Sequence, residues 1–420
     1  RLKRFVLEYG DAPLIEKGRA TIASFLKEQG YRTACVGKWH LGLGWSRDAQ
    51  GQVDFAKPFH SGPTDFGFDY FYGLEASLNQ PPYVFLENDH STAIPDTVRG
   101  EKEYPIGSPR CNRDVVIYGP ADSQYSLQEC TGQLQKKALE VIDQFSEQRD
   151  TPFFLYYPTP APHVPWVPSK EFEGASGIGY YGDFVLMIDH MVGEIMDKLR
   201  KKGLENDTIF LFSSDNGSGA FTDIRNLLRQ GHNPSYIYRG YKGDIYEGGH
   251  RVPYLIKAPG LIRAGQKTDA LVSLGDLFAT LADLFSVTLP DHVAEDSVSN
   301  LPLWLGSDRA VREDMVYSSF FGCLALQKGP WKLEMCPGAG SPADRNMDSS
   351  RLEQFQLYRM DADVTERINL IQDNPEVFEQ LRQQLISYIE NGRSTPGEPQ
   401  KNSGPEHDYW EEIAWVRNSQ

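Results

Sequence analysis

A run of β-forming residues that ends in acidic and amide side chains places the strongest constraint on the fold of this chain. Residues 208–212, Thr-Ile-Phe-Leu-Phe, are apolar at nearly every position, which favours a strand buried on both faces, as in a parallel sheet under helices. Two serines follow, and then Asp215-Asn216-Gly217. Open α/β sheets bind ligands at the carboxyl ends of strands, and two adjacent oxygen ligands suit a hard divalent cation. An ordinary turn is the alternative, since Asp-Asn-Gly is typical turn chemistry.

Strand and helix patterns alternate along residues 19–286, which is typical of an α/β fold with a parallel sheet. Strands are expected at 31–36, 152–157 and 252–256, and amphipathic helices at 19–29, 124–148, 179–203 and 273–286. Further along, three short strands between residues 315 and 335 are joined by tight turns, and a helix follows at 375–390. We expect a mainly parallel central sheet flanked by helices in residues 1–305, a smaller α+β domain built on an antiparallel sheet in 306–392, and a tail in 393–420.

The composition excludes several classes of function. The net charge of −16 argues against nucleic acid or an anionic membrane as a partner. No run of about 18 apolar residues occurs, so we expect no membrane span. Five cysteines without a Cys-x-x-Cys spacing do not fit a zinc–thiolate site. Pairing of Cys111 with Cys130, pairing of Cys323 with Cys336, and free thiols throughout all stay open.

Loops that follow predicted strands carry side chains suited to acid–base or anion chemistry. Lys38 and His40 lie two residues apart among glycines, and in an extended backbone both side chains would point to the same side. His163 lies in a proline-rich loop with a restricted backbone. The glycine-rich segment 239–253 carries Lys242 and is typical of a functional loop. Each pattern alone is also typical of ordinary solvated or packed side chains.

Taken in order, these motifs resemble the type I sulfatases of the alkaline phosphatase superfamily. Each motif is modest by itself, but the ordered set is specific and covers nearly the whole chain. The resemblance rests on Gly37-Lys-Trp-His-Leu-Gly42, Phe66-Gly-Phe-Asp-Tyr-Phe-Tyr-Gly73, Pro162-His163, Ser214-Asp-Asn-Gly217 and the segment from Gly240 to Pro253.

The resemblance implies an arylsulfatase-like sulfuric ester hydrolase that uses a formylglycine nucleophile and one Ca²⁺ ion. Asp215 and Asn216 match calcium ligands of the family, and a carboxylate beside a neutral carbonyl suits Ca²⁺ better than zinc. The family makes formylglycine from a Cys/Ser-x-Pro-Ser-Arg motif, which occurs nowhere in this sequence. We interpret the chain as N-terminally truncated, with at most half a calcium site, no nucleophile and no activity alone. A missing central strand should leave hydrophobic sheet surface uncovered.

The resemblance also implies roles for four candidate catalytic residues. Lys38 and His40 match the pair that holds and deprotonates the hydrated aldehyde nucleophile. His163 and Lys242 match the groups that grip the sulfate and assist departure of the alcohol. Histidine acts as acid or base near neutral pH, and lysine supplies fixed positive charge. Three other polar residues of the glycine-rich loop are assigned to loop structure: Glu247, His250 and Arg251.

The substrate class and the setting follow only from the resemblance. A sulfated polysaccharide, a glycosaminoglycan and a small aryl sulfate stay open as substrates. The implied setting is extracytoplasmic (periplasmic, lysosomal or secreted), with the formylglycine-generating enzyme as a partner of the full-length protein. Two alternatives remain: a phosphoester or phosphonate hydrolase of the same superfamily, for which the sequence offers too few metal ligands, and a catalytically silent carbohydrate-binding relative. A Cys/Ser-x-Pro-Ser-Arg motif upstream of Arg1 would favour the sulfatase, and a start codon there would favour the silent relative.

Overall fold

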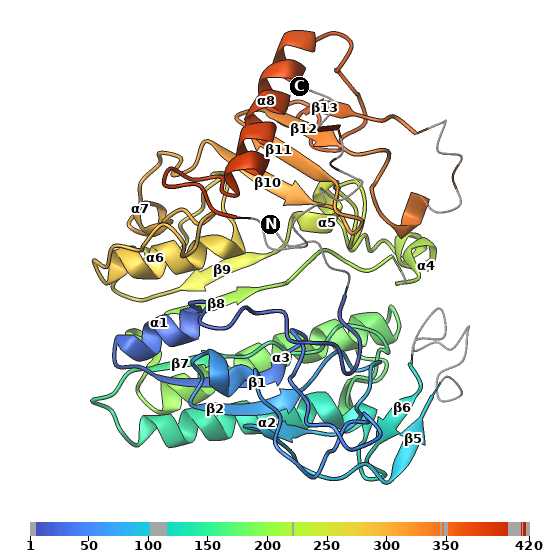
Figure 1. Ribbon diagram of the computed structural model, residues 1–420, viewed down its shortest axis with the longest axis vertical. Helices are drawn as coiled ribbons and strands as arrows, with labels where there is room; N and C mark the ends of the chain where they lie inside the picture. Colours follow the sequence, from blue (N-terminus) through green and yellow to red (C-terminus); the bar gives the residue numbers. More distant parts are fainter. Residues whose placement is uncertain are drawn as a thin grey trace. The chain divides into compact units, whose positions relative to one another are not determined.

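The computed structural model describes residues 6–100, 116–220, 222–344, 347, 352–401, 413, 415 and 416. These residues form two compact units, each described by itself. The N-terminal unit consists of residues 6–205 and 222–230, and the C-terminal unit consists of residues 206–220 and the described residues from 231 onward (Figure 1).

The N-terminal unit is built around a five-stranded mixed sheet. In spatial order its strands are β4 (His90–Ser91), β3 (Leu86–Glu87), β2 (Tyr70–Leu74), β1 (Arg32–Lys38) and β7 (Phe153–Tyr156). β1 is parallel to both of its neighbours, with Cys35 opposite Phe71 on β2 and Tyr156 on β7, whereas β3 and β4 are antiparallel. The carboxyl ends of β1, β2 and β7 therefore lie at one edge of the sheet.

Helices of this unit form where the apolar spacing predicts them. Thr21 begins the first helix because its side chain accepts the Ser24 amide in a capping box, and Ser126 caps the second by accepting the Glu129 amide. Three helices of this unit were predicted, and each lies inside its predicted range: α1 (Ile22–Glu28), α2 (Leu127–Ser146) and α3 (Tyr180–Lys201). The short elements are β5 (Thr97–Arg99), β6 (Gly119–Ala121), α4 (Ile224–Arg229) and 3-10 turns at Pro63–Phe66 and Lys170–Phe172.

Side chains of β1 alternate between two hydrophobic cores, as the two-residue period of a strand requires. Ala34 and Val36 pack in one core with Leu134 of α2 and Phe184 of α3. Cys35, between them, packs in the opposite core together with residues of α1 and β2. β1 is therefore the buried centre of this unit, and its carboxyl end is held in a fixed position.

The C-terminal unit contains a strand pair and a four-stranded antiparallel sheet. β8 (Phe210–Ser213) pairs with β9 (Tyr254–Lys257). The larger sheet has the order β10 (Asp314–Ser318), β11 (Leu324–Lys328), β12 (Trp331–Met335) and β13 (Gln356–Arg359). The helices are α5 (Glu247–His250), α6 (Leu277–Leu284), α7 (Leu301–Trp304) and α8 (Pro375–Asn391), with 3-10 turns at Glu205–Asp207, Leu274–Asp276 and Pro342–Asp344.

The two faces of the larger sheet have different cover. One face packs Leu326 and Leu333 against Leu385 of α8, which lies across the sheet in Figure 1. The other face packs β11 and β13 against Ile245 and Tyr246 of the glycine-rich segment. The sheet thus supports the segment that carries Lys242.

The α/β class with a C-terminal antiparallel sheet is confirmed, but the expected burial of β8 is wrong. Its four residues are each only half-buried, because among the described residues β8 pairs with β9 alone, and that pairing is antiparallel. Leu255 of its partner strand β9 is 63% exposed, and within the N-terminal unit Tyr156 of β7 is 46% exposed.

Two expectations about cysteines and membranes are resolved for the described residues. Cys323 and Cys336 are buried and carry no disulfide bond, as are Cys35 and Cys130, while Cys111 lies outside the described residues. Across the part of the chain that the structure describes, no helix is both long enough and apolar enough to span a membrane.

Candidate active site

Lys38 and His40 lie where β1 ends. Gly37 takes a φ of +134°, and a Cβ there would lie 2.3 Å from the Pro158 carbonyl oxygen, so only glycine fits. The Lys38 amide donates to the same oxygen at 2.8 Å. His40 has a φ of +55°, so the backbone is not extended at this residue, and the same-side placement that an extended backbone would give Lys38 and His40 does not follow. The Trp39 amide donates to the Leu74 oxygen at 2.9 Å, so the chain stays bonded to the end of β2 immediately after Lys38.

The ring of His40 is oriented by a backbone carbonyl. Nε2 lies 3.0 Å from the Leu7 oxygen, and because a carbonyl only accepts, Nε2 carries the hydrogen and Nδ1 is the basic nitrogen of the neutral ring. The His40 amide donates to the Glu75 oxygen at 2.6 Å. His40 is thus fixed at both its backbone and its ring.

His163 lies in the loop that follows β7. Its amide donates to the Pro160 oxygen at 3.0 Å, and cis peptide bonds precede Pro162 and Pro165 on either side of it. Nδ1 lies 2.9 Å from the Val164 oxygen, so Nδ1 donates and Nε2 is the basic nitrogen. Because β1 and β7 are parallel, this loop lies at the same sheet edge as Lys38 and His40.

Glu75 follows β2 at this edge and was missed by the sequence analysis. It is only 3% exposed, and the Gly10 amide lies 3.5 Å from its Oε1. Burial raises the pKa of Glu75 to about 7, against opposing effects from the Trp45 side chain and the Gly10 amide, and with a further rise from Asp11. An acidic residue two positions after the Phe66–Gly73 motif was the available signal.

Glu75→Gln is expected to remove a pH-dependent loss of stability. The folded-state pKa of Glu75 is raised from 4.5 to about 7, so the unfolded chain ionises first, and the wild-type protein loses stability as pH rises from about 4.5 through 7. The loss amounts to roughly 3 kcal/mol above pH 7. Thermal midpoints at pH 5 and pH 8 measure it. The thermal midpoint of Glu75→Gln minus that of wild type should be larger at pH 8 than at pH 5. Glu28→Gln, at an exposed position, is the matched control. An equal pH response in Glu75→Gln and wild type would contradict this reading.

Asp215 and Asn216 follow β8 in the C-terminal unit. Asp215 is exposed and Asn216 is half-buried. Nδ2 of Asn216 donates to the Gly217 oxygen at 3.1 Å, which leaves Oδ1 as the acceptor end of the amide. The Ser214 hydroxyl donates to the Asn216 carbonyl at 3.0 Å and closes the turn.

This turn packs backbone to backbone against the glycine-rich segment. The Gly217 amide donates to the Gly249 oxygen at 3.0 Å, and the Lys242 amide donates to the Ser218 oxygen at 2.8 Å. A Cβ on Gly217 would lie 1.8 Å from the Gly248 oxygen, so the close approach requires glycine. The structure thereby brings the two candidate metal ligands next to the loop of Lys242.

The donor chemistry of Asp215 and Asn216 fits part of a calcium site. A carboxylate and an amide oxygen are both hard ligands. Within the described residues, no group of three or more His, Cys, Asp or Glu side chains is arranged to hold a metal ion. The two oxygens therefore fit a hard cation without completing its coordination.

The residues assigned to loop structure make structural contacts. Glu247 is 5% exposed and pairs with Lys332 at 3.1 Å and with Arg251 at 3.3 Å. The His250 ring packs edge-on against Tyr317, with centroids 5.3 Å apart. Burial, and then the charge of Lys332, lowers the pKa of His250 to about 4, so this ring is neutral at physiological pH.

The predicted site residues divide between the two units. The N-terminal unit collects one set at the carboxyl edge of its sheet, and the C-terminal unit collects the other where two glycine-bearing loops meet. The first set is Lys38, His40 and His163, and the second is Asp215, Asn216 and Lys242.

Comparisons with known proteins give one consistent family. A family model described as Sulfatase matches residues 5–287. An N-acetylgalactosamine-6-O-sulfatase of Bacteroides thetaiotaomicron is 34% identical over 404 residues, which cover 89% of this chain and 78% of that protein. An arylsulfatase of Hemicentrotus pulcherrimus is 30% identical over 318 residues, covering 76% of this chain and 52% of that protein, so the chain spans about half of this relative.

A solved structure is similar over most of the chain. It is described under the metabolism of multiple glycosaminoglycans by Bacteroides thetaiotaomicron, and it is 32% identical with a TM-score of 0.78. The match covers 91% of this chain and 84% of that one. A sequence match and a structural match from Bacteroides thetaiotaomicron thus each cover most of the chain.

Proposed function

The chain belongs to the sulfatase family of sulfuric ester hydrolases, and from this premise we propose that its residues catalyse cleavage of a sulfate ester on a saccharide. A 6-O-sulfated N-acetylgalactosamine residue is the first candidate substrate. The observation that carries this choice is the 34% identity over 404 residues to an N-acetylgalactosamine-6-O-sulfatase. An aryl sulfate is a suitable general test substrate, because an arylsulfatase is also among the relatives.

His40 and Lys38 act on the nucleophile in this proposal. Because the Leu7 carbonyl holds Nε2–H, Nδ1 of His40 is the nitrogen that accepts the nucleophile's proton. Lys38, two residues earlier at the end of β1, supplies a fixed positive charge that favours the deprotonated form. The backbone bonds of both residues keep this pair in place before substrate binds.

His163 and Lys242 act on the sulfate and on the leaving alcohol. With Nδ1 of His163 donating to the Val164 carbonyl, Nε2 is the position that holds and releases the proton needed by the departing oxygen. The Lys242 ammonium offsets negative charge on the sulfuryl oxygens. Its loop is anchored to the Asp215–Asn216 turn through the Ser218 oxygen.

Members of the family generally use a Ca²⁺ ion and a formylglycine. When bound, the ion polarises the sulfuryl oxygens, and the formylglycine provides the attacking hydroxyl. Asp215 and Asn216 would hold the ion through their side-chain oxygens. The printed sequence contains no Cys/Ser-x-Pro-Ser-Arg motif, so the formylglycine is assigned to no residue of it.

We place the reaction outside the cytoplasm and name the formylglycine-generating enzyme as the partner that matures the complete gene product. Fractionation of cells that express the complete gene product tests the location. Recovery of the mature protein only in the cytoplasmic fraction would refute it.

A pair of substrates with one leaving group tests the proposed function. The complete gene product is assayed with p-nitrophenyl sulfate and p-nitrophenyl phosphate, with and without a calcium chelator. The expected result is turnover of the sulfate in preference to the phosphate, lost on chelation and restored by Ca²⁺. A preference for the phosphate would favour the phosphoester hydrolase, and turnover of neither would favour the silent relative.

A further inference from the structure

Lys332 is a fully buried lysine on the face of the antiparallel sheet that supports the glycine-rich segment. Its side chain is 0% exposed, and its Nζ donates to the Ile245 carbonyl at 3.2 Å, to Glu247 Oε1 at 3.1 Å and to Glu366 Oε1 at 2.6 Å. An ammonium has three donors, so all three are satisfied. Two of the three acceptors belong to the segment that follows Lys242.

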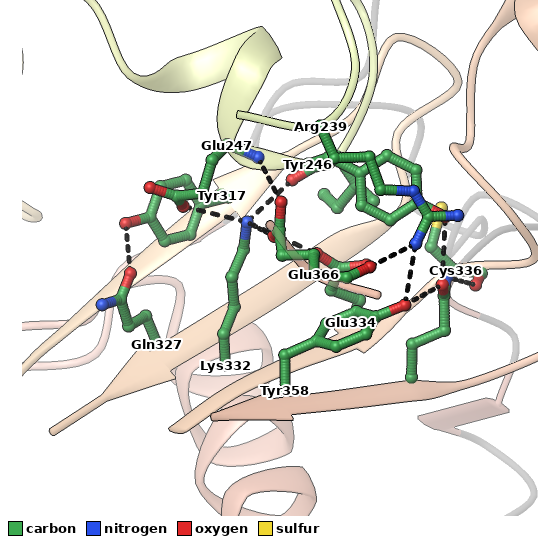
Figure 2. Close-up of polar contacts among 12 residues, drawn as sticks. Arg239, Tyr246, Glu247, Tyr317, Gln327, Lys332, Glu334, Cys336, Tyr358 and Glu366 are labelled. Carbon is green, nitrogen blue, oxygen red and sulfur yellow. Dashed lines mark hydrogen bonds and ion pairs between the residues drawn. The ribbon is translucent and has the colours of Figure 1, made fainter. Parts of the chain in front are cut away.

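Glu366 binds both Lys332 and the backbone of Glu247. While Oε1 accepts from Lys332, Oε2 accepts the Glu247 amide at 2.8 Å. Figure 2 shows Lys332 reaching up from β12 to meet Glu247 and Glu366. The guanidinium of Arg239 donates to the Glu366 carbonyl and to the Tyr358 hydroxyl. Arg239 and Glu247 of the glycine-rich segment are therefore tied to one buried cluster.

The turn that carries Lys242 lies three residues before this anchor. Within it, Asp244 Oδ2 accepts the Tyr241 amide at 2.8 Å, and the Ser341 hydroxyl donates to Asp244 Oδ1. The Ile245 amide donates to the Ala339 oxygen at 2.9 Å. The residues that hold Ile245 and Glu247 therefore limit where this turn, and Lys242 with it, can lie.

The charges of the cluster favour a persistent lysine cation. Burial alone would lower the pKa of Lys332, but the charges of Glu334, Glu366 and Glu247 raise this pKa well above its ordinary value. Burial raises the pKa of Glu334 well above its ordinary value, and the charge of Lys332, whose Nζ lies 3.3 Å from Glu334 Oε1, opposes that rise. Burial alone would raise the pKa of Glu247, but the charges of Lys332 and then Arg251 lower it below its ordinary value.

We propose that Lys332 is a positioning residue for Lys242: by clamping Ile245 and Glu247, it sets where the Lys242 ammonium meets the sulfate. The proposal rests on the proposed function for its effect on turnover. A purely structural lysine at this position would stabilise the unit without any particular link to Lys242. The two readings differ in whether the effects of changing Lys332 and Lys242 are coupled.

A double-mutant cycle of Lys332 and Lys242 in the complete gene product separates the positioning role from a purely structural role. Lys332→Met is expected to lower kcat for p-nitrophenyl sulfate by about 10- to 100-fold and to leave kcat unchanged when Lys242 is already alanine. Glu247→Gln, which keeps an acceptor for Lys332, supplies the same comparison if Lys332→Met does not fold. Equal fold-losses in both backgrounds would overturn the proposal.

Arg312→Met is the matched control for loss of a buried cation. Arg312 is 6% exposed and pairs with the fully buried Asp276 in the same unit. Its other hydrogen bonds among the described residues go to the Asp314 and Asp296 carbonyls, outside the glycine-rich segment. The Arg312→Met variant should be less stable than wild type, and its effect on kcat should be the same with Lys242 or alanine at position 242. Coupling of equal size in Arg312→Met would also overturn the proposal, because it would show that any buried charge loss disturbs Lys242.

Hydrogen–deuterium exchange gives a readout that does not depend on turnover. Amides of residues 241–247 should exchange faster in Lys332→Met than in wild type, and at the wild-type rate in Arg312→Met. Unchanged exchange in Lys332→Met would overturn the positioning role. If the wild-type protein turned over no sulfate ester, the proposed function would fail while this measurement would still decide whether Lys332 positions the loop.

Discussion

Lys242→Ala in the complete gene product is expected to lower kcat for sulfate esters by about a thousandfold while the protein stays folded. The ammonium is proposed to offset charge that develops on the sulfuryl oxygens, and a preorganised charge of this kind is worth most in the transition state. The side chain makes no hydrogen bond or ion pair with other described residues, so alanine removes no contact that holds the loop. Steady-state kinetics with p-nitrophenyl sulfate, together with the thermal midpoint, measure both parts of the expectation.

Lys267→Ala is the control for this experiment. Lys267 is an exposed lysine of the same unit that has no proposed role, so its removal changes the net charge by the same amount. Its kcat should match that of wild type. Near-normal turnover in Lys242→Ala would refute the role given to Lys242, and a collapse of the thermal midpoint would mean that the lysine is structural.

His163→Ala is expected to slow a saccharide sulfate far more than p-nitrophenyl sulfate. A sugar alkoxide is a poor leaving group and needs a proton as the S–O bond breaks, whereas p-nitrophenolate leaves without one. Loss of a general acid costs about 10²- to 10⁴-fold in rate, so kcat for the saccharide should fall by that factor. The fall for the aryl sulfate should be much smaller.

The two substrates make this prediction specific to proton donation. If His163 only gripped the sulfate, both substrates would slow by the same factor, because they share the sulfuryl group. His190→Ala serves as the control, since His190 lies on α3 of the same unit and its Nε2 is 3.7 Å from Glu194. Equal losses with both substrates in His163→Ala would contradict the general-acid role.

Much of the fold follows from local patterns in the sequence. The apolar stripes of α2 and α3 and the caps at Thr21 and Ser126 are short-range signals, and the helices lie inside the predicted ranges. The burial of β8 was not predictable in this way. Whether a strand of apolar residues is covered depends on which strands pair with it, and β8 has only an antiparallel partner among the described residues.

The candidate site shows the same division between local and distant information. Lys38, His163 and Lys242 stand in short motifs that a reader of the sequence can recognise. Lys332 and Glu247 are 85 positions apart, and neither is marked by a motif that predicts their contact. The positive φ of His40 was not marked by its sequence neighbours either, and its amide bonds the carbonyl of Glu75, 35 positions away and directly after β2.

The central claim is that these residues hydrolyse a sulfate ester on a saccharide. Its most direct test is inorganic sulfate released from a 6-O-sulfated N-acetylgalactosamine oligosaccharide by the complete gene product, after mass spectrometry has verified formylglycine in that product. The account predicts one sulfate released for each desulfated sugar, with Lys242→Ala lowering the rate about a thousandfold. No sulfate release from this substrate or from an aryl sulfate, despite verified formylglycine and added Ca²⁺, would contradict it.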